Sequence, residues 1–168
     1  MRKIIALDVG LNHLGVALVE EEKVIHTYLI APKASWGLSD KLGYIYREVR
    51  SLTDSFFSTP EESRYLLFEN PVFSFNSSTG KKLDYVVGVL YLIASQYSCS
   101  VESYAVKEIK KELGIKQGKL KKTRENNKSE VKDKILQLVD YNLETLSDHE
   151  VDAIAVSQCY LLRNKIKA

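Results

Sequence analysis

Residues 3–30, KIIALDVGLNHLGVALVEEEKVIHTYLI, decide the fold, because they predict three consecutive strands joined by short turns. Each apolar run in this stretch is five to seven residues long, which is a usual length for a strand. A glycine-containing or charged stretch follows each of the first two runs and marks a turn. We therefore expect a three-stranded meander with strands at 3–7, 14–19 and 24–30 and turns at 8–12 and 20–22.

Beyond the meander, helical and strand patterns alternate to the end of the chain, and Ser39 is the expected N-cap of the first helix. This order predicts an α/β fold, with a five-stranded mixed sheet flanked by helices on both faces. No internal repeat or domain boundary is visible, so residues 1–168 are expected to form one domain. The expected helices are 39–57, 79–97, 106–113, 129–139 and 148–162, and the further strands are 64–68 and 101–104.

The composition is that of a soluble globular protein, with 45% apolar and 27% charged residues. The longest apolar runs are too short to span a bilayer, and the first strand carries an aspartate that a signal peptide would lack. We therefore expect an intracellular, cytoplasmic protein without a membrane span. Cys99 and Cys159 have neither disulfide-framework nor metal-ligand spacing and are expected to be reduced thiols.

The formal net charge of +2 conceals one strongly cationic segment. Residues 107–134 contain eleven Lys or Arg residues against five Asp or Glu residues, whereas the rest of the chain is net acidic. Such a segment can neutralise phosphates and release counterions from nucleic acid. A solvated helix and loop face would have the same composition, so the charge alone leaves both interpretations open.

Two carboxylates end strands that are predicted to be buried. Asp8 follows four apolar residues, and Glu69 follows Leu66-Leu67-Phe68. A carboxylate in this position is costly unless it is solvated, paired or bound to a metal ion. Either residue alone could be a turn former or a cap, although glutamate is poorly suited to turns. Ligand sites in open α/β sheets lie beyond the carboxyl ends of strands, where both residues are expected.

The start of the last predicted helix carries a third acidic element, SDHEVDAIA at 147–155. His149 and Asp152 are three residues apart and therefore project from the same side of the helix. Together with Asp8 and Glu69 they would form an oxygen-rich cluster with one imidazole, which suits Mg²⁺ or Mn²⁺. The alternative is that the acidic residues only complement the dipole at the helix N-terminus.

Taken in order, these motifs resemble the RuvC family of Holliday-junction resolvases, which have a ribonuclease-H-like fold. The similarity covers essentially the whole chain. It consists of Asp8-x-Gly10 after the first strand with Gly15 beyond it, Glu69 at the end of the fourth strand, and His149-x-x-Asp152-Ala in the last helix. The matching positions in the middle of the chain are Asn76, Leu83, Gly88 and Lys128.

The resemblance implies a Mg²⁺-dependent, structure-selective endonuclease, with Mn²⁺ as the alternative ion, that cleaves four-way junctions and other branched DNA as a homodimer. The implied metal ligands are Asp8, Glu69, His149 and Asp152. Lys128 would contact the scissile phosphate, and the apolar helix at 79–97 would supply much of the dimer surface. The candidate DNA contacts are Phe73, Phe75, Lys81, Lys82, Lys110, Lys119, Lys121, Lys122, Arg124 and Lys128.

The chain also departs from the family pattern. The wedge aromatic of the family falls at Val72, so Phe73 or Phe75 is expected to stack on unpaired bases instead. The stretch at 114–127 looks longer and more basic than usual, which would change which cleavage sequences or branched structures are accepted. The small size and the Lys/Asn/Tyr-rich composition resemble phage-encoded members.

Three other functions remain open at this stage. An actin-like or sugar-kinase ATPase also begins with Asp-x-Gly, but it needs two such domains and the sequence has one Asp-x-Gly hairpin. Another ribonuclease-H-like nuclease, acting on RNA–DNA hybrids or on ribosomal RNA precursors, would have the same fold. A non-catalytic nucleic-acid-binding module would be indicated by the loss of an acidic ligand, yet all four candidate positions are filled.

Overall fold

The computed structural model describes residues 1–59, 63–70, 78–115 and 124–165. Five strands form one mixed sheet in the order β3-β2-β1-β4-β5. The first three strands pair antiparallel as a meander, while β1 pairs parallel with β4 and β4 pairs parallel with β5. The predicted fold class is therefore confirmed. The strands are β1 (Arg2–Asp8), β2 (Leu14–Glu20), β3 (Lys23–Ile30), β4 (Ser63–Glu69) and β5 (Ser100–Tyr104).

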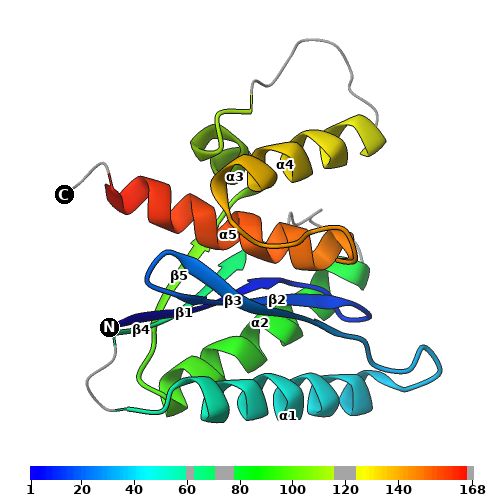
Figure 1. Cartoon of the computed structure of the whole chain (residues 1–168). Helices are drawn as coiled ribbons and strands as arrows, with labels where there is room; N and C mark the ends of the chain where they lie inside the picture. Colours follow the sequence, from blue (N-terminus) through cyan, green and yellow to red (C-terminus); the bar gives the residue numbers. More distant parts are fainter. Residues whose placement is uncertain (60–62, 71–77, 116–123, 166–168) are drawn as a thin grey trace.

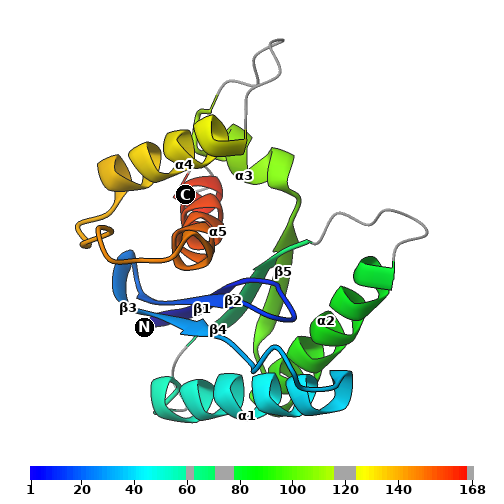
Figure 2. The ribbon, with the colours of Figure 1, turned by 90° about the vertical axis from the view of Figure 1, so that its right-hand side faces the viewer.

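Helices cover both faces of the sheet. Two of them, α1 and α2, lie against one face, and α5 lies against the other with α3 and α4 stacked over it (Figures 1 and 2). None of the described helices is both long and apolar enough to cross a membrane. The helices are α1 (Leu38–Phe56), α2 (Ser78–Gln96), α3 (Val106–Glu112), α4 (Arg124–Leu138) and α5 (Asp148–Lys165).

The central strand β1 explains why the first apolar run in the sequence is unbroken. Ile4 and Ala6 belong to the core under α5, and Ile5 and Leu7 belong to the core under α1 and α2. All four side chains are fully buried because neighbouring residues of a strand point to opposite faces and both faces are covered. A strand in this position presents its carboxyl-terminal end, and not its faces, to solvent.

Two helix starts differ from the sequence-based expectation. Gly37, with extended backbone, is the N-cap of α1, so Ser39 lies inside the first turn instead of capping it. Helix α4 begins at Arg124, five residues earlier than expected, because residues 124–128 (RENNK) contain no proline or glycine that would stop a helix.

Candidate active site

The two strand-ending carboxylates lie at the same edge of the sheet. Asp8 is the last residue of β1 and Glu69 is the last residue of β4. The two strands are parallel neighbours, and their register pairs Leu7 with Phe68. Asp8 and Glu69 therefore leave adjacent strands at the same level, as the sequence predicted.

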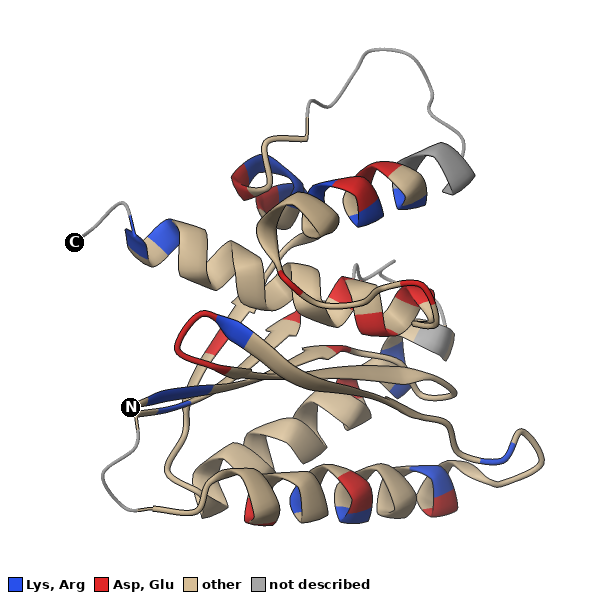
Figure 3. Ribbon diagram, viewed as in Figure 1, with Lys and Arg blue, Asp and Glu red and all other residues tan. Residues whose placement is uncertain are grey.

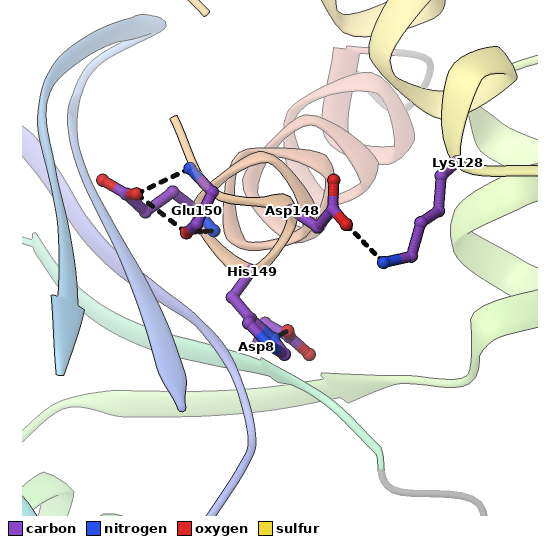
Figure 4. Close-up of polar contacts among 6 residues, drawn as sticks. Asp8, Lys128, Asp148, His149 and Glu150 are labelled. Carbon is purple, nitrogen blue, oxygen red and sulfur yellow. Dashed lines mark hydrogen bonds and ion pairs between the residues drawn. The ribbon is translucent and has the colours of Figure 1, made fainter. Parts of the chain in front are cut away.

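The first turn of α5 sends three consecutive side chains in three directions (Figure 4). His149 points to the end of β1, where its Nδ1 lies 2.6 Å from Oδ2 of Asp8. Asp148 points away from His149 and forms an ion pair with Lys128 of α4. The start of α5 is thereby tied to the sheet and to α4 by neighbouring residues.

The third residue of this turn, Glu150, closes the helix start. It accepts hydrogen bonds from the backbone N–H and the hydroxyl of Ser147, at 2.9 and 2.8 Å. It also accepts a hydrogen bond of 2.8 Å from the hydroxyl of Thr27 on β3. Within the acidic run at 147–155, Glu150 therefore caps the helix start, whereas His149 contacts Asp8.

Gly10 and Gly15 of the first motif are required for steric reasons. A Cβ atom added at Gly15 would lie 2.0 Å from the carbonyl oxygen of His149, so only glycine lets the start of α5 approach β2 this closely. A Cβ atom at Gly10 would lie 2.0 Å from the carbonyl oxygen of His13, which makes glycine necessary for the tight turn after Asp8. Both glycines thus fix the backbone around the Asp8–His149 contact.

The carboxylates form one electrostatic cluster. Burial, together with the nearby charges of Asp8 and Asp152, raises the pKa of Glu69 from 4.5 to about 7. Burial, with the charges of Asp8 and Asp148, raises the pKa of Asp152 from 3.8 to about 6. Burial also raises the pKa of Asp8, against the lowering effect of its hydrogen bond with His149. The structure therefore brings Asp8, Glu69 and Asp152 within electrostatic reach of one another.

This cluster has the donor chemistry of a divalent-cation site, because Mg²⁺ and Mn²⁺ prefer carboxylate oxygens and a cation would relieve the mutual repulsion. The geometry is not that of a ready-made site. Among the described residues, no three His, Cys, Asp or Glu side chains are arranged as a ligand set for a metal ion. The assignment of Asp8, Glu69, His149 and Asp152 as metal ligands therefore stays a prediction.

Lys128 lies beside the cluster. It is paired with Asp148, and this hydrogen bond lowers the pKa of the Asp148 carboxyl. Its charge also lowers the pKa values of Asp8 and Asp152, although burial outweighs it at both. The ammonium group is thus at the margin of the acidic cluster, where a phosphate would have to approach.

The other predicted contacts fall in different places. Lys81 and Lys82 are exposed in the first turns of α2. Lys110 of α3 is near enough to Glu69 for its charge to oppose the rise in the Glu69 pKa. Arg124 is the first residue of α4, but its side chain is not described. The predicted contacts that lie outside the described residues are Phe73, Phe75, Lys119, Lys121 and Lys122.

Sequence reasoning missed two further contacts of the site. The ring of His13 stacks on that of His149, with centroids 5.5 Å apart and an interplanar angle of 7°. The preceding residue, Asn12, accepts a hydrogen bond of 2.7 Å from Nζ of the buried Lys41 on α1. The turn after Asp8 is thus held on two sides. Its polar residues at 12 and 13 were the one sequence feature that could have indicated this.

Comparison with known proteins gives a structural likeness only. No protein-family model matches the sequence, and no curated protein matches it. Two solved structures of RuvC from Thermus thermophilus, one of them in complex with a Holliday junction substrate, match with a TM-score of 0.79 at 16% identity. In each case 98% of this chain aligns with 96% of the other. The chain therefore has the ribonuclease-H-like fold, as in RuvC, over nearly its full length.

Proposed function

We propose that the protein is a divalent-metal-dependent endonuclease that cleaves four-way junctions and other branched DNA. The observation that carries the proposal is the cluster of Asp8, Glu69 and Asp152 at the carboxyl ends of β1 and β4, with His149 and Lys128 at its margin. Carboxylates with pKa values raised by burial and by one another cluster at functional sites, where such groups bind a cation or move protons. The likeness to RuvC over nearly the whole chain agrees with this chemistry.

In this mechanism Asp8, Glu69 and Asp152 would hold the cation, and His149 would serve as a further ligand or carry a proton. A bound Mg²⁺ would activate water for in-line attack on a phosphodiester and stabilise the developing charge. Lys128, whose charge acts on Asp152, would exchange its partner Asp148 for a phosphate oxygen. Both side chains of this pair are substantially exposed, so the exchange costs little.

The substrate class follows from charge and from the fold. Lys110 lies near enough to Glu69 for its charge to act there, and Lys81 and Lys82 are exposed in the first turns of α2. Such charges attract the phosphate backbone. A RuvC of the same fold has been solved with a Holliday junction substrate. We therefore infer that the substrate is a branched DNA duplex. A phage origin and a cytoplasmic location remain predictions of the sequence alone.

The decisive experiment compares three proteins on four substrates. Wild type, Asp8→Asn and the exposed control Asp140→Asn are incubated with a four-way junction, a Y-fork, an RNA–DNA hybrid and a linear duplex, in Mg²⁺ or EDTA. We expect the wild type and Asp140→Asn to nick the junction and the fork in Mg²⁺, and Asp8→Asn to bind both without cleaving. Cleavage of the hybrid in preference to the junction would assign the site to another nuclease. Full cleavage by Asp8→Asn would end the metal-site proposal.

We also propose that α2 forms a homodimer interface. Tyr85, Tyr91 and Leu92 are each more than half exposed on this helix. Gly88 lies among them, and a Cβ atom there would meet nothing within 4 Å. Figure 3 shows that charged residues are sparse along α2 beyond its first turns. An uncharged aromatic and aliphatic face of this kind usually marks an interface.

The dimer proposal is tested by sedimentation at micromolar concentration. We expect the wild type to sediment as a dimer and Leu92→Glu as a folded monomer. Leu136→Glu is the matched control, because Leu136 of α4 is 52% exposed and Leu92 is 53% exposed. A monomeric wild type, or a dimer that survives Leu92→Glu, would contradict the assignment of α2.

A further inference from the structure

A cavity of about 450 Å³ opens at the start of α1, away from the acidic cluster. This volume lies within the range of small-molecule sites and is ample for one nucleotide. Its lining combines one indole, one guanidinium, one carboxylate and a hydroxyl. The lining residues are Trp36, Ser39, Asp40, Gly43 and Arg47.

Trp36 is held in place within this pocket. Its ring meets that of Tyr44 edge-on, with centroids 5.5 Å apart and an interplanar angle of 72°. The backbone N–H of Trp36 donates a hydrogen bond of 3.1 Å to the carbonyl of Lys33, and Nζ of Lys33 lies 5.6 Å from the indole centroid. The indole is therefore an oriented, half-buried aromatic surface with a cation beside it.

Gly43 is an unusual residue for the middle of α1. Glycine destabilises a helix interior relative to alanine, so its presence calls for an explanation. It faces the cavity, and a Cβ atom there would lie 3.4 Å from Nη1 of Arg47. This is an ordinary contact with the end of a flexible side chain, so alanine would fit without a clash but would place a methyl group in the cavity wall. Glycine thus leaves this part of the wall without a side chain.

The helix that carries the cavity is bonded to the turn beside the candidate active site. Lys41, in the first turns of α1, is buried and donates a hydrogen bond of 2.7 Å to Oδ1 of Asn12, in the turn that follows Asp8. The first turns of α1 and of α5 lie at the same end of the molecule, on the right in Figure 1. The pocket and the acidic cluster therefore lie toward the same end of the molecule, on opposite faces of the sheet (Figures 1 and 2).

We propose that the Trp36 pocket binds an unpaired nucleobase of the branched DNA, stacked on the indole. Stacking on aromatic side chains is the main source of affinity for unpaired bases. A base carries both donors and acceptors on its edge, which suits a pocket holding both Asp40 and Arg47 better than a bare phosphate would. The inference rests on the proposed function for the presence of DNA, but not for cleavage.

The test uses the fact that Trp36 is the sole tryptophan of the chain. Asp8→Asn protein, which is not expected to cleave, is titrated in EDTA with a Y-fork that has single-stranded arms and with a blunt linear duplex. Binding is followed by the anisotropy of labelled DNA, and Trp36 fluorescence is followed in parallel. We expect the fork to quench Trp36 in step with binding, and the duplex to bind without quenching it. A fork that binds while Trp36 stays unquenched would overturn the proposal.

Three variants test the site further. Trp36→Ala should weaken fork binding roughly tenfold and leave duplex binding unchanged, because one base–aromatic stack is lost. Trp36→Phe should recover most of the affinity. Gly43→Ala should raise the melting temperature and still weaken fork binding, a combination that a purely structural role does not give. Equal losses on fork and duplex with Trp36→Ala would contradict base stacking.

The outcomes also separate this inference from the proposed nuclease. Quenching by the fork together with a wild type that cleaves none of the branched substrates would end the nuclease proposal and leave the pocket standing. If branched DNA is cleaved but does not quench Trp36 fluorescence, the pocket assignment is wrong and the nuclease proposal still stands. A protein that binds neither DNA would overturn both.

Discussion

Replacing Glu69 with glutamine should stabilise the metal-free protein at alkaline pH. Glu69 is partly buried beside Asp8 and Asp152, and its pKa is raised from 4.5 to about 7. At 1.36 kcal/mol per pKa unit, the ionised carboxylate destabilises the folded state by roughly 3 kcal/mol above pH 7. Glutamine has nearly the same shape without the charge, so Glu69→Gln should raise the free energy of unfolding by about that amount.

The stability of the wild type should fall as the pH rises through the range in which Glu69 ionises. Below about pH 4.5 the carboxyl is protonated in both states and makes no difference. As the pH rises to about 7, the unfolded chain releases this proton while the folded protein retains it, so wild-type stability falls and then levels off. Glu69→Gln should lack this fall. For a chain of this size, the gain corresponds to a melting temperature about 6–12 °C higher at pH 8.

The assay is thermal unfolding in EDTA at pH 4.5 and pH 8, with the exposed Glu144→Gln as control. Mg²⁺ should stabilise the wild type and not the variant, by about 2.7 kcal/mol at a hundred times the dissociation constant. If Glu69→Gln melts at or below the wild-type temperature at pH 8, the carboxylates do not repel one another. Asp8, Glu69 and Asp152 then do not form an electrostatic cluster.

Three further predictions follow from the same contacts. Gly15→Ala should lower the free energy of unfolding by about 1–3 kcal/mol, because its Cβ would collide with the carbonyl of His149. The control variant Gly43→Ala should not lower the free energy of unfolding, and urea unfolding measures both variants. Asp148→Asn should change stability by less than about 1 kcal/mol, because both partners of its ion pair are exposed, and a larger loss by calorimetry would show that the pair holds α4 in place. Replacing Lys81 and Lys82 with alanine should reduce the slope of log Kd against log salt by about one to two, and an unchanged slope would remove α2 from the DNA contacts.

The fold was accessible from the sequence because each strand of the sheet has a local pattern. The buried middle of β1 appears as an unbroken apolar run, and the carboxylates at its end and at the end of β4 appear as abrupt polar stops. Parallel pairing then brings Asp8 and Glu69 to one edge without any further information. Helix starts were less accessible, because the glycine cap at Gly37 and the early start of α4 at Arg124 have no strong local pattern.

The side-chain partners of the site residues were the hardest feature to predict from the sequence. The pairs Asp148–Lys128 and His13–His149 join segments 20 or more residues apart, and nothing local in either segment requires the partner. Sequence patterns report which residues are buried or exposed, whereas pairing between side chains depends on distances that only the assembled elements determine.

One feature of the site connects its stability to its proposed chemistry. The start of α5 is held to the sheet by the hydrogen bond that Thr27 of β3 donates to Glu150, and Gly15 lets it approach β2. These contacts fix the backbone from which His149 and Asp152 project, so the acidic cluster cannot spread apart to reduce its repulsion. The site therefore keeps carboxylates close together at a cost to folding, and a cation among them would recover that free energy. Rigid support around mutually repelling groups is what a metal-dependent nuclease needs and what a structural cap alone does not explain.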